Sequence, residues 1–273
     1  MKNEIINKIK SLNVYDSELW IKEAEFGFTQ VSRYCKNINT PSNVLEIGCG
    51  SGILLSMMTN KFNSFTFDGI EPLYDGYKSV SELNKIINDT GVKIENVAYE
   101  AYKTKKKYDL IYCINVFEHV DDWRHFLTTV SGWLNKNGKI LILAPNYSFP
   151  YESHFNIPII INKLITYSVF KTLIDKHEKK NNNKGLWDSL NFVKKNEVHN
   201  FIKTKSYLTL IDDVSIIDIM INRAIKDNEF RSRHKFLSLT AEIIKKTGTS
   251  KILKLFSGKL PYMKLEIRKN NET

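Results

Sequence analysis

The sequence of 273 residues has no apolar run near the roughly 20 residues that a transmembrane helix requires. Its first segment, MKNEIINKIKSLN, is amphipathic and lacks the apolar core of a secretion signal, so we expect a cytoplasmic protein. It has only three cysteines, Cys35, Cys49 and Cys113, which lie far apart. Cysteines in this pattern are typical of a reducing compartment and form no metal-ligand cluster, so we expect no bound metal.

Acidic residues are fewer than basic ones, and the formal net charge is +10. Such an excess is compatible with nucleic acid, an anionic membrane or a phosphorylated substrate as the partner. The lysines are spread in short groups along the chain, which favours solvated surfaces over a single binding face. The overall field would still favour an anionic acceptor.

Short apolar strands alternate with helices in the middle of the chain, which predicts βαβ units and a parallel sheet. We expect strands near residues 43–47, 65–70, 93–97, 108–114 and 139–144. The helices between them are expected near 52–61, 76–90 and 122–135. Two amphipathic helices, over 1–12 and 16–38, precede the sheet and are expected to form part of a lid.

The regular alternation ends after Pro145. Residues 150–195 are too few for a second core, so we expect a helical insertion, with an apolar helix near 159–175. Asn196 is expected to cap the next short helix. Later elements are expected as strands near 206–211 and 262–268 and helices near 215–226 and 232–256. The chain thus divides into N-terminal helices over 1–40 and one α/β domain over 41–273.

A glycine-rich turn follows the first expected strand, in the segment VLEIGCGSG over 44–52. Glycine permits the sharp turn and close ligand approach that a Cβ would block. The third glycine of the dinucleotide fingerprint is missing, because position 53 is Ile. Glu46 instead stands two residues before the first glycine, where a carboxylate could pair with the ammonium group of S-adenosylmethionine (SAM).

This segment resembles the first motif of class I SAM-dependent methyltransferases. The resemblance implies a doubly wound, mostly parallel, seven-stranded α/β sheet of the Rossmann-like type. It also implies SAM as the cofactor and S-adenosylhomocysteine as the product. In this loop it assigns cofactor binding to Glu46, Gly48, Cys49, Gly50 and Gly52.

Glu71 ends the second expected strand, where a carboxylate can accept hydrogen bonds from both ribose hydroxyls of a nucleoside. The resemblance places Pro72 and Leu73 beside the adenine. The family often has an acidic residue after the third strand, but this chain has Ala98 and Tyr99, which could meet the ring through backbone and stacking.

The segment KYDLIYCINVFEHV over 107–120 resembles strand four of small-molecule O-methyltransferases, including the ubiquinone-biosynthesis type. The resemblance implies that Cys113, Asn115 and Val116 line the methionine end of SAM. The segment NGKILILAPN over 137–146 resembles the run into strand five, with Asn137 in place of the first of two glycines. Asn137 also tolerates a positive φ.

Methyl transfer needs an acceptor atom held in line with the leaving sulfur, and a hydroxyl acceptor also benefits from a base. His119 follows strand four and is one candidate, although capping or packing under the next helix explains it equally well. Tyr151, Glu152 and His154 follow strand five between two prolines, and we expect them to shape the acceptor site. His154 is the better base of these, and the alternative is a rigid loop packed on the insertion.

We therefore expect methyl transfer to an oxygen of a small, anionic acceptor, such as a phosphorylated or nucleotide-linked precursor of a surface polysaccharide. Nucleic acid is disfavoured, because the chain lacks the N/D-P-P-Y/F motif and a nucleophilic cysteine beside a proline. Metal-dependent catalysis is disfavoured because Asp121 and Asp122 begin a helix. The alternatives are a SAM-dependent methyltransferase that binds RNA or other nucleic acid, and a non-catalytic SAM-binding module. The oligomeric state stays open.

Overall fold

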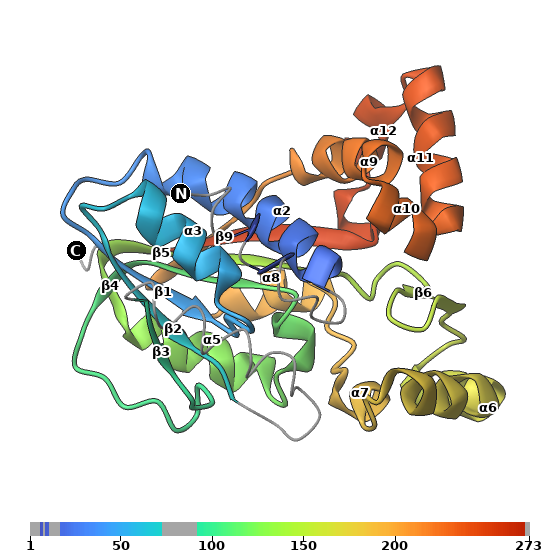
Figure 1. The fold of residues 1–273 in the computed structure, drawn as a ribbon, viewed down its shortest axis with the longest axis horizontal. Coiled ribbons are helices and arrows are strands. Elements are labelled where there is room, and N and C mark those ends of the chain that lie inside the picture. The colour runs from blue at the N-terminus through green and yellow to red at the C-terminus, as the bar shows by residue number, and fades with distance from the viewer. Residues whose placement is uncertain (1–5, 8, 11–16, 73–91, 271–273) are drawn as a thin grey trace.

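A computed structural model describes residues 6–7, 9–10, 17–72 and 92–270 of the chain (Figure 1). Within these ranges one sheet has the strand order β3-β2-β1-β4-β5-β9-β8. Neighbouring strands pair in parallel except at β9, which runs antiparallel to both β5 and β8. The strands are β1 (Asn43–Ile47), β2 (Thr66–Ile70), β3 (Lys93–Glu95), β4 (Tyr108–Ile114), β5 (Leu134–Pro145), β8 (Leu208–Asp212) and β9 (Tyr262–Lys269). The doubly wound, mostly parallel sheet of seven strands is thus confirmed.

Helices cover both faces of this sheet, so its central strands are apolar almost throughout. Side chains alternate along β4, and Tyr112 joins the core beneath α2 (Ser17–Cys35) and α3 (Ile53–Lys61). Cys113, one residue later, joins the core beneath α5 (Trp123–Gly132) and α8 (Lys195–Lys203). In Figure 1, α2 and α3 lie on one side of the strands and α5 on the other.

The expected strands agree with the observed ones to within a few residues, except at the start of β5. Leu134 already pairs with Tyr108, and the register shifts before Lys139 pairs with Leu110. Asn137 lies within this irregular stretch and has a φ of 63°, a left-handed backbone conformation that asparagine tolerates. The expected helix over 76–90 lies outside the described residues, as do Leu73 and most of the expected helix over 1–12.

Two expectations about helix boundaries were wrong. Asn196 does not cap α8, because the helix begins at Lys195 and its N-cap is Lys194. The Lys195 backbone amide donates to Oδ1 of Asn146 at 3.0 Å, so a contact with the end of β5 sets where the helix starts.

The long helix expected over 232–256 is divided into α10 (Asn228–Arg233), α11 (Lys235–Thr247) and α12 (Ser250–Leu255). The chain departs from helical geometry at His234, and Gly248 ends α11 with a φ of 67°.

Two helical excursions leave the sheet and lie on the same side of the molecule (Figure 1). The first cap, residues 146–194, confirms the insertion after strand five; it adds a short hairpin of β6 (Tyr151–Glu152) and β7 (Ile157–Pro158) that the sequence analysis did not expect. The hairpin is followed by α6 (Lys163–Asn181) and α7 (Leu186–Ser189). The second cap, residues 213–261, joins β8 to β9 and contains α9 (Ile216–Lys226) and α10 to α12.

Candidate active site

A cavity of about 2140 Å³ lies at the carboxyl ends of β1 and β4, where the order of the strands reverses. Open α/β sheets bind their ligands at this position. The glycine loop, the ends of β2, β4 and β5, helix α2 and both caps all contribute to its wall. The second cap was not expected to line the site, so the enclosure comes from two excursions rather than one.

The glycine loop adopts backbone conformations that other residues rarely accept. Gly48, Gly50 and Gly52 have φ values of 70°, 52° and 75°. A Cβ on Gly48 would lie 2.3 Å from Cγ2 of Val116, so glycine lets the end of β1 approach the end of β4. Gly52 is not part of the cavity wall and acts through the turn, where its amide donates to the Cys49 carbonyl at 2.8 Å.

Two carboxylates flank this loop inside the cavity. Glu46 is buried and accepts a hydrogen bond from the Tyr112 hydroxyl at 2.9 Å, and burial raises the pKa of Glu46 to about 8. Oε2 of Glu71 accepts the Gly50 amide at 2.8 Å, and burial raises the pKa of Glu71 as well. Among the described residues neither carboxylate forms an ion pair. A buried acid and a partly buried acid without a cation fit a ligand that brings an ammonium group and hydroxyl donors.

Most of the other expected cofactor residues line the cavity, and one does not. Pro72, Ala98, Tyr99, Asn115 and Val116 line the cavity with Cys49. The Tyr99 ring is fixed edge-on against Phe126, with their centroids 4.9 Å apart. Cys113 is not on the cavity wall, because alternation along β4 turns its side chain into the core beneath α5. The placement of that side chain beside SAM is therefore corrected.

His154 and Glu152 form a hydrogen-bonded pair within the β6–β7 hairpin, where the Glu152 side chain is buried and the His154 side chain is 25% exposed. Nδ1 of His154 lies 2.6 Å from Oε1 of Glu152, which also accepts the Tyr147 hydroxyl at 3.3 Å, while Oε2 of Glu152 accepts the Phe155 amide at 2.8 Å. Burial disfavours the charged imidazole, but the hydrogen bond and charge of Glu152 outweigh it, so the pKa of His154 is raised. Burial acts the other way on Glu152, and the same contact keeps its pKa lowered. This pair therefore favours an ionised Glu152 and a basic His154.

Glu118 completes this cluster, and the sequence analysis missed it. Its side chain is fully buried, and neither carboxylate oxygen has a hydrogen-bond partner among the described residues. Burial raises the pKa of Glu118 to about 7, although the nearby charge of His154 lowers it. A buried acceptor left without a partner is costly, and here it faces the cavity. Its place beside His119 in the segment FEHV was the signal available in the sequence.

His119 and Tyr151, the other two candidate catalytic residues, each have a hydrogen-bond partner outside the His154–Glu152 pair. The His119 ring contacts the His154 ring, and its Nδ1 lies 2.9 Å from Oγ of Ser189. Burial lowers the pKa of His119 to about 3, so it stays neutral and is a poor proton acceptor. The Tyr151 hydroxyl donates to Asn156 at 2.8 Å, so it bonds away from His154 although Tyr151 lines the cavity.

Glu118, His119 and His154 each offer a ligand atom within 4.8 Å of the others, a spacing that a metal ion could use. The expectation of no bound metal stays a prediction.

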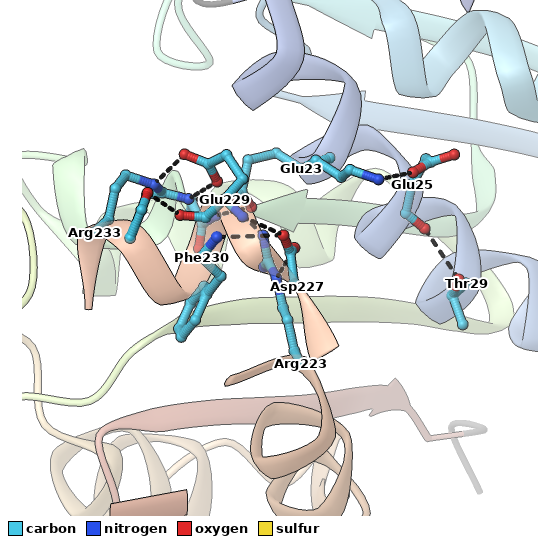
Figure 2. A network of polar contacts seen from close by, with 11 residues as sticks. Glu23, Glu25, Thr29, Arg223, Asp227, Glu229, Phe230 and Arg233 are labelled. Carbon is cyan, nitrogen blue, oxygen red and sulfur yellow. Dashed lines mark hydrogen bonds and ion pairs between the residues drawn. The ribbon is translucent and has the colours of Figure 1, made fainter. Parts of the chain in front are cut away.

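Figure 2 shows an ionic network that joins α2 to the second cap. Oε1 of Glu23 accepts from Arg223 at 2.6 Å and from Arg233 at 3.1 Å. The two arginines also pair with Asp227 and Glu229, respectively. Because Glu23 and Arg223 are 200 residues apart, no local pattern in the sequence could have indicated the network.

Comparison with known proteins agrees with the cofactor site that this geometry indicates. A family model described as a methyltransferase domain matches residues 20–208. The chain belongs to the class I SAM-dependent methyltransferases. Its glycine loop and paired carboxylates fit SAM, the cofactor of this family.

Relatives of this methyltransferase include an uncharacterized protein of Mycobacterium tuberculosis, 30% identical over 214 residues that cover 77% of this chain and 72% of that protein. The ubiquinone biosynthesis O-methyltransferase of Rickettsia felis is 25% identical over 46% of this chain and 56% of its own length. The (S)-coclaurine N-methyltransferase of Papaver somniferum is 24% identical over 46% of this chain and 36% of its own. Oxygen and nitrogen methyltransferases therefore both occur among its relatives.

A crystal structure of the plantazolicin methyltransferase BpumL, in complex with a pentazolic desmethylPZN analog and S-adenosylhomocysteine, has the same fold as this methyltransferase. The TM-score is 0.55 with 16% sequence identity, and the match covers 97% of this chain and 91% of that one.

Proposed function

We propose that this methyltransferase methylates an oxygen of a small acceptor, and that His154 and Glu118 together take up the proton of the acceptor hydroxyl. The observation that carries the proposal is the buried Glu118 carboxylate, which has no hydrogen-bond partner among the described residues and shares the cavity with His154, whose Nδ1 is hydrogen-bonded to Glu152. Glu152 is a positioning residue, because it fixes Nδ1 of His154 and leaves Nε2 for the acceptor.

The residues around the glycine loop would hold SAM. Glu46 would bind its ammonium group, Glu71 its ribose hydroxyls, and Tyr99 would pack near its adenine, while Asn115 and Val116 would border its methionine end. When bound, SAM supplies an electrophilic methyl group on a sulfonium. The remaining chemistry belongs to the chain: it holds the acceptor, excludes water and accepts a proton.

In the reaction the acceptor loses its O–H bond and gains an O–CH3 bond, and the proton passes to the His154–Glu118 pair. Glu118 can take up a proton only when it is ionised, and its pKa of about 7 lies near the operating pH of a general base. The two groups share one buried cluster, so they titrate as a pair. The neutral His119 can orient the acceptor through a hydrogen bond without competing for the proton.

The acceptor that we propose to test first is a phosphorylated or nucleotide-linked sugar of a surface polysaccharide. Support comes from the net charge of +10 and from Lys180 and Lys184 in the cavity wall. Arg223 and Arg233 are bound to carboxylates and add no free positive charge. The two lysines are therefore the groups that would recognise a phosphate. An anionic acceptor stays a prediction, as does a cytoplasmic location.

The test combines SAM binding by calorimetry with an acceptor panel and labelled SAM. The panel contains neutral sugars, sugar phosphates, nucleotide sugars, small amines and polynucleotide. Methylation of a hydroxyl that is lost in Glu118→Gln and His154→Ala, with SAM affinity unchanged, would support the proposal. Products from amines alone would contradict the oxygen assignment. Polynucleotide binding with a steep salt dependence, and no small-molecule product, would favour the nucleic-acid alternative.

A further inference from the structure

Large apolar side chains are exposed mainly on the two caps. Among the described residues, thirteen large apolar side chains are exposed, and eleven of them lie in the segments 161–173 and 236–256. The other two, Ile211 and Val214, are the least exposed of the set, at 36% each. Scattered apolar residues on a surface need no explanation, but this concentration indicates an interaction surface.

The exposed residues of the first cap form a stripe that leads to the cavity. Ile165, Val169 and Leu173 follow one another at four-residue intervals, which places them along one side of α6, and the exposed Ile161 precedes the helix. Continuing that side of the helix leads to His177 and Lys180, and both line the cavity. The stripe therefore ends at the mouth of the active site.

The second cap has a corresponding stripe on α11. Phe236, Leu239 and Ile243 have a spacing of three and four residues, so they lie on one face of the helix, and each is more than half exposed. Phe236 also belongs to the cavity wall. Ile252, Leu255 and Phe256 extend the exposed apolar surface onto α12 and the residue after it. Both caps thus present apolar side chains beside the same opening.

The same two segments carry most of the net charge of the chain. Residues 161–181 contain five lysines against two carboxylates, and residues 235–259 contain six lysines against one carboxylate. Together they account for eight of the ten net positive charges. The lysine groups look scattered along the sequence, but the fold gathers them beside the exposed apolar stripes of the two caps.

We propose that these two stripes dock the enzyme on the surface of an anionic lipid bilayer, with the cavity mouth toward the membrane. Amphipathic helices with apolar and lysine-rich sides bind in the interfacial region, where apolar side chains insert and lysines meet anionic headgroups. No helix in the described ranges has the length and apolar character to cross a bilayer, so the contact is peripheral. A docked protein partner is the competing occupant, and it would not require anionic lipid.

The test is vesicle co-sedimentation of the full chain with phosphatidylcholine alone and with phosphatidylcholine mixed with phosphatidylglycerol. We expect binding to the mixed vesicles that is at least about tenfold stronger than to phosphatidylcholine, and that weakens with salt. Val169→Gln with Leu173→Gln, or Leu239→Gln with Ile243→Gln, should reduce binding several-fold. These side chains are exposed, so SAM affinity should stay unchanged and should report that the variants are folded.

Two double charge reversals, one on the caps and one elsewhere, distinguish docking through the caps from a general effect of the net charge. Lys171→Glu with Lys251→Glu removes positive charge from the caps and should weaken vesicle binding. Lys103→Glu with Lys105→Glu removes the same charge from the exposed stretch before β4, at the opposite end of the strands from the cavity, and should not. Equal effects of the two pairs, or no binding of wild type to mixed vesicles, would overturn the proposal. Self-association of the wild type that the apolar variants abolish would then identify a second copy as the occupant.

Discussion

His154 lies with its Nδ1 2.6 Å from Oε1 of Glu152, although only one residue separates the two in the chain. The pairing depends on the β6–β7 hairpin, where Glu152 pairs with Ile157. The backbone amide of Phe155 holds the second oxygen of Glu152, so the carboxylate cannot turn away from the imidazole. The hairpin thereby fixes the orientation of the imidazole that we propose as the base.

The first prediction concerns this pair. His154→Ala should lower kcat by about 10²–10⁴-fold, because the proton of the acceptor loses its main recipient. Glu152→Gln should lower kcat by less, since it weakens only the orientation and basicity of His154. Steady-state kinetics and calorimetry with SAM provide the measurements, and SAM affinity should not change. His199→Ala is the matched control, because His199 forms a similar pair with Asp212 at 2.9 Å outside the cavity wall. Full turnover in His154→Ala would show that the base is misassigned.

The pH dependence of turnover should show the titration of Glu118. Burial raises its pKa to about 7, and only the ionised form accepts a proton, so kcat should rise as the pH increases through about 7. In Glu118→Gln the remaining rate should be low, and any rise with pH should follow the titration of His154 alone. Asp121→Asn changes an exposed acid of the same cavity wall and should keep the wild-type profile. A profile for Glu118→Gln that matches wild type would contradict the role of Glu118.

Glu118 should also make the protein less stable at high pH. Its pKa is about 7 in the folded state against 4.5 for the free group, so the folded state binds the proton more tightly. Stability is therefore fully present below about pH 4.5 and is lost as the pH rises through about 7, by up to about 3 kcal/mol. Glu118→Gln should raise the free energy of unfolding at about pH 8.5 and have little effect near pH 4.5. Urea denaturation at the two pH values measures this difference, and an equal effect at both would refute it.

Gly48→Ala should impair SAM binding. The new Cβ would lie 2.3 Å from Val116 in a residue with a φ of 70°, so both the loop and the end of β4 must shift. We expect affinity for SAM to fall at least about tenfold, which corresponds to roughly 1.4 kcal/mol. Gly132→Ala is the control, because a Cβ there meets no atom within 4 Å and its φ is not positive. Unchanged affinity in Gly48→Ala would mean that the loop does not contact the cofactor.

Glu23→Gln should loosen the second cap. The change removes the charge shared by Arg223 and Arg233, and the Arg223 side chain is only 8% exposed, so its guanidinium loses a partner that it cannot replace with water. We expect a loss of about 1–3 kcal/mol and faster amide exchange over α9 and α10. Glu242→Gln breaks a more exposed pair with Arg231 and should have an effect below about 1 kcal/mol. Equal exchange in the two variants would show that the network does not hold the cap.

Local patterns in the sequence were sufficient for the sheet and for the cofactor loop. The glycines of the loop and Glu71 lie at the ends of consecutive strands, so their meeting follows from the parallel βαβ pattern alone. It was harder to predict which face of the sheet each side chain occupies. The Cys113 side chain lies in the core on the face of β4 that α5 covers, whereas Asn115 and Val116 line the cavity. A one-residue error in position is enough to move a side chain across a sheet.

Contacts between segments that are far apart in the sequence could not be predicted from it. Glu118 is fully buried without a hydrogen-bond partner among the described residues, and no motif in the sequence records the packing that does this. The start of α8 is set by Asn146 rather than by a capping residue of its own. The second cap is joined to α2 by the ion pair of Glu23 and Arg223, and only the fold brings these two residues together.

The position of β9 has a consequence for how the enzyme is made. This strand comes last in the chain but lies inside the sheet, between β5 and β8. Its first residue, Tyr262, donates a hydrogen bond of 2.7 Å to Oδ1 of Asn115 at the end of β4. The sheet can therefore be completed only after residues 262–269 have left the ribosome. A chain cut before Tyr262 would lack the strand between β5 and β8 and the hydrogen bond to Asn115.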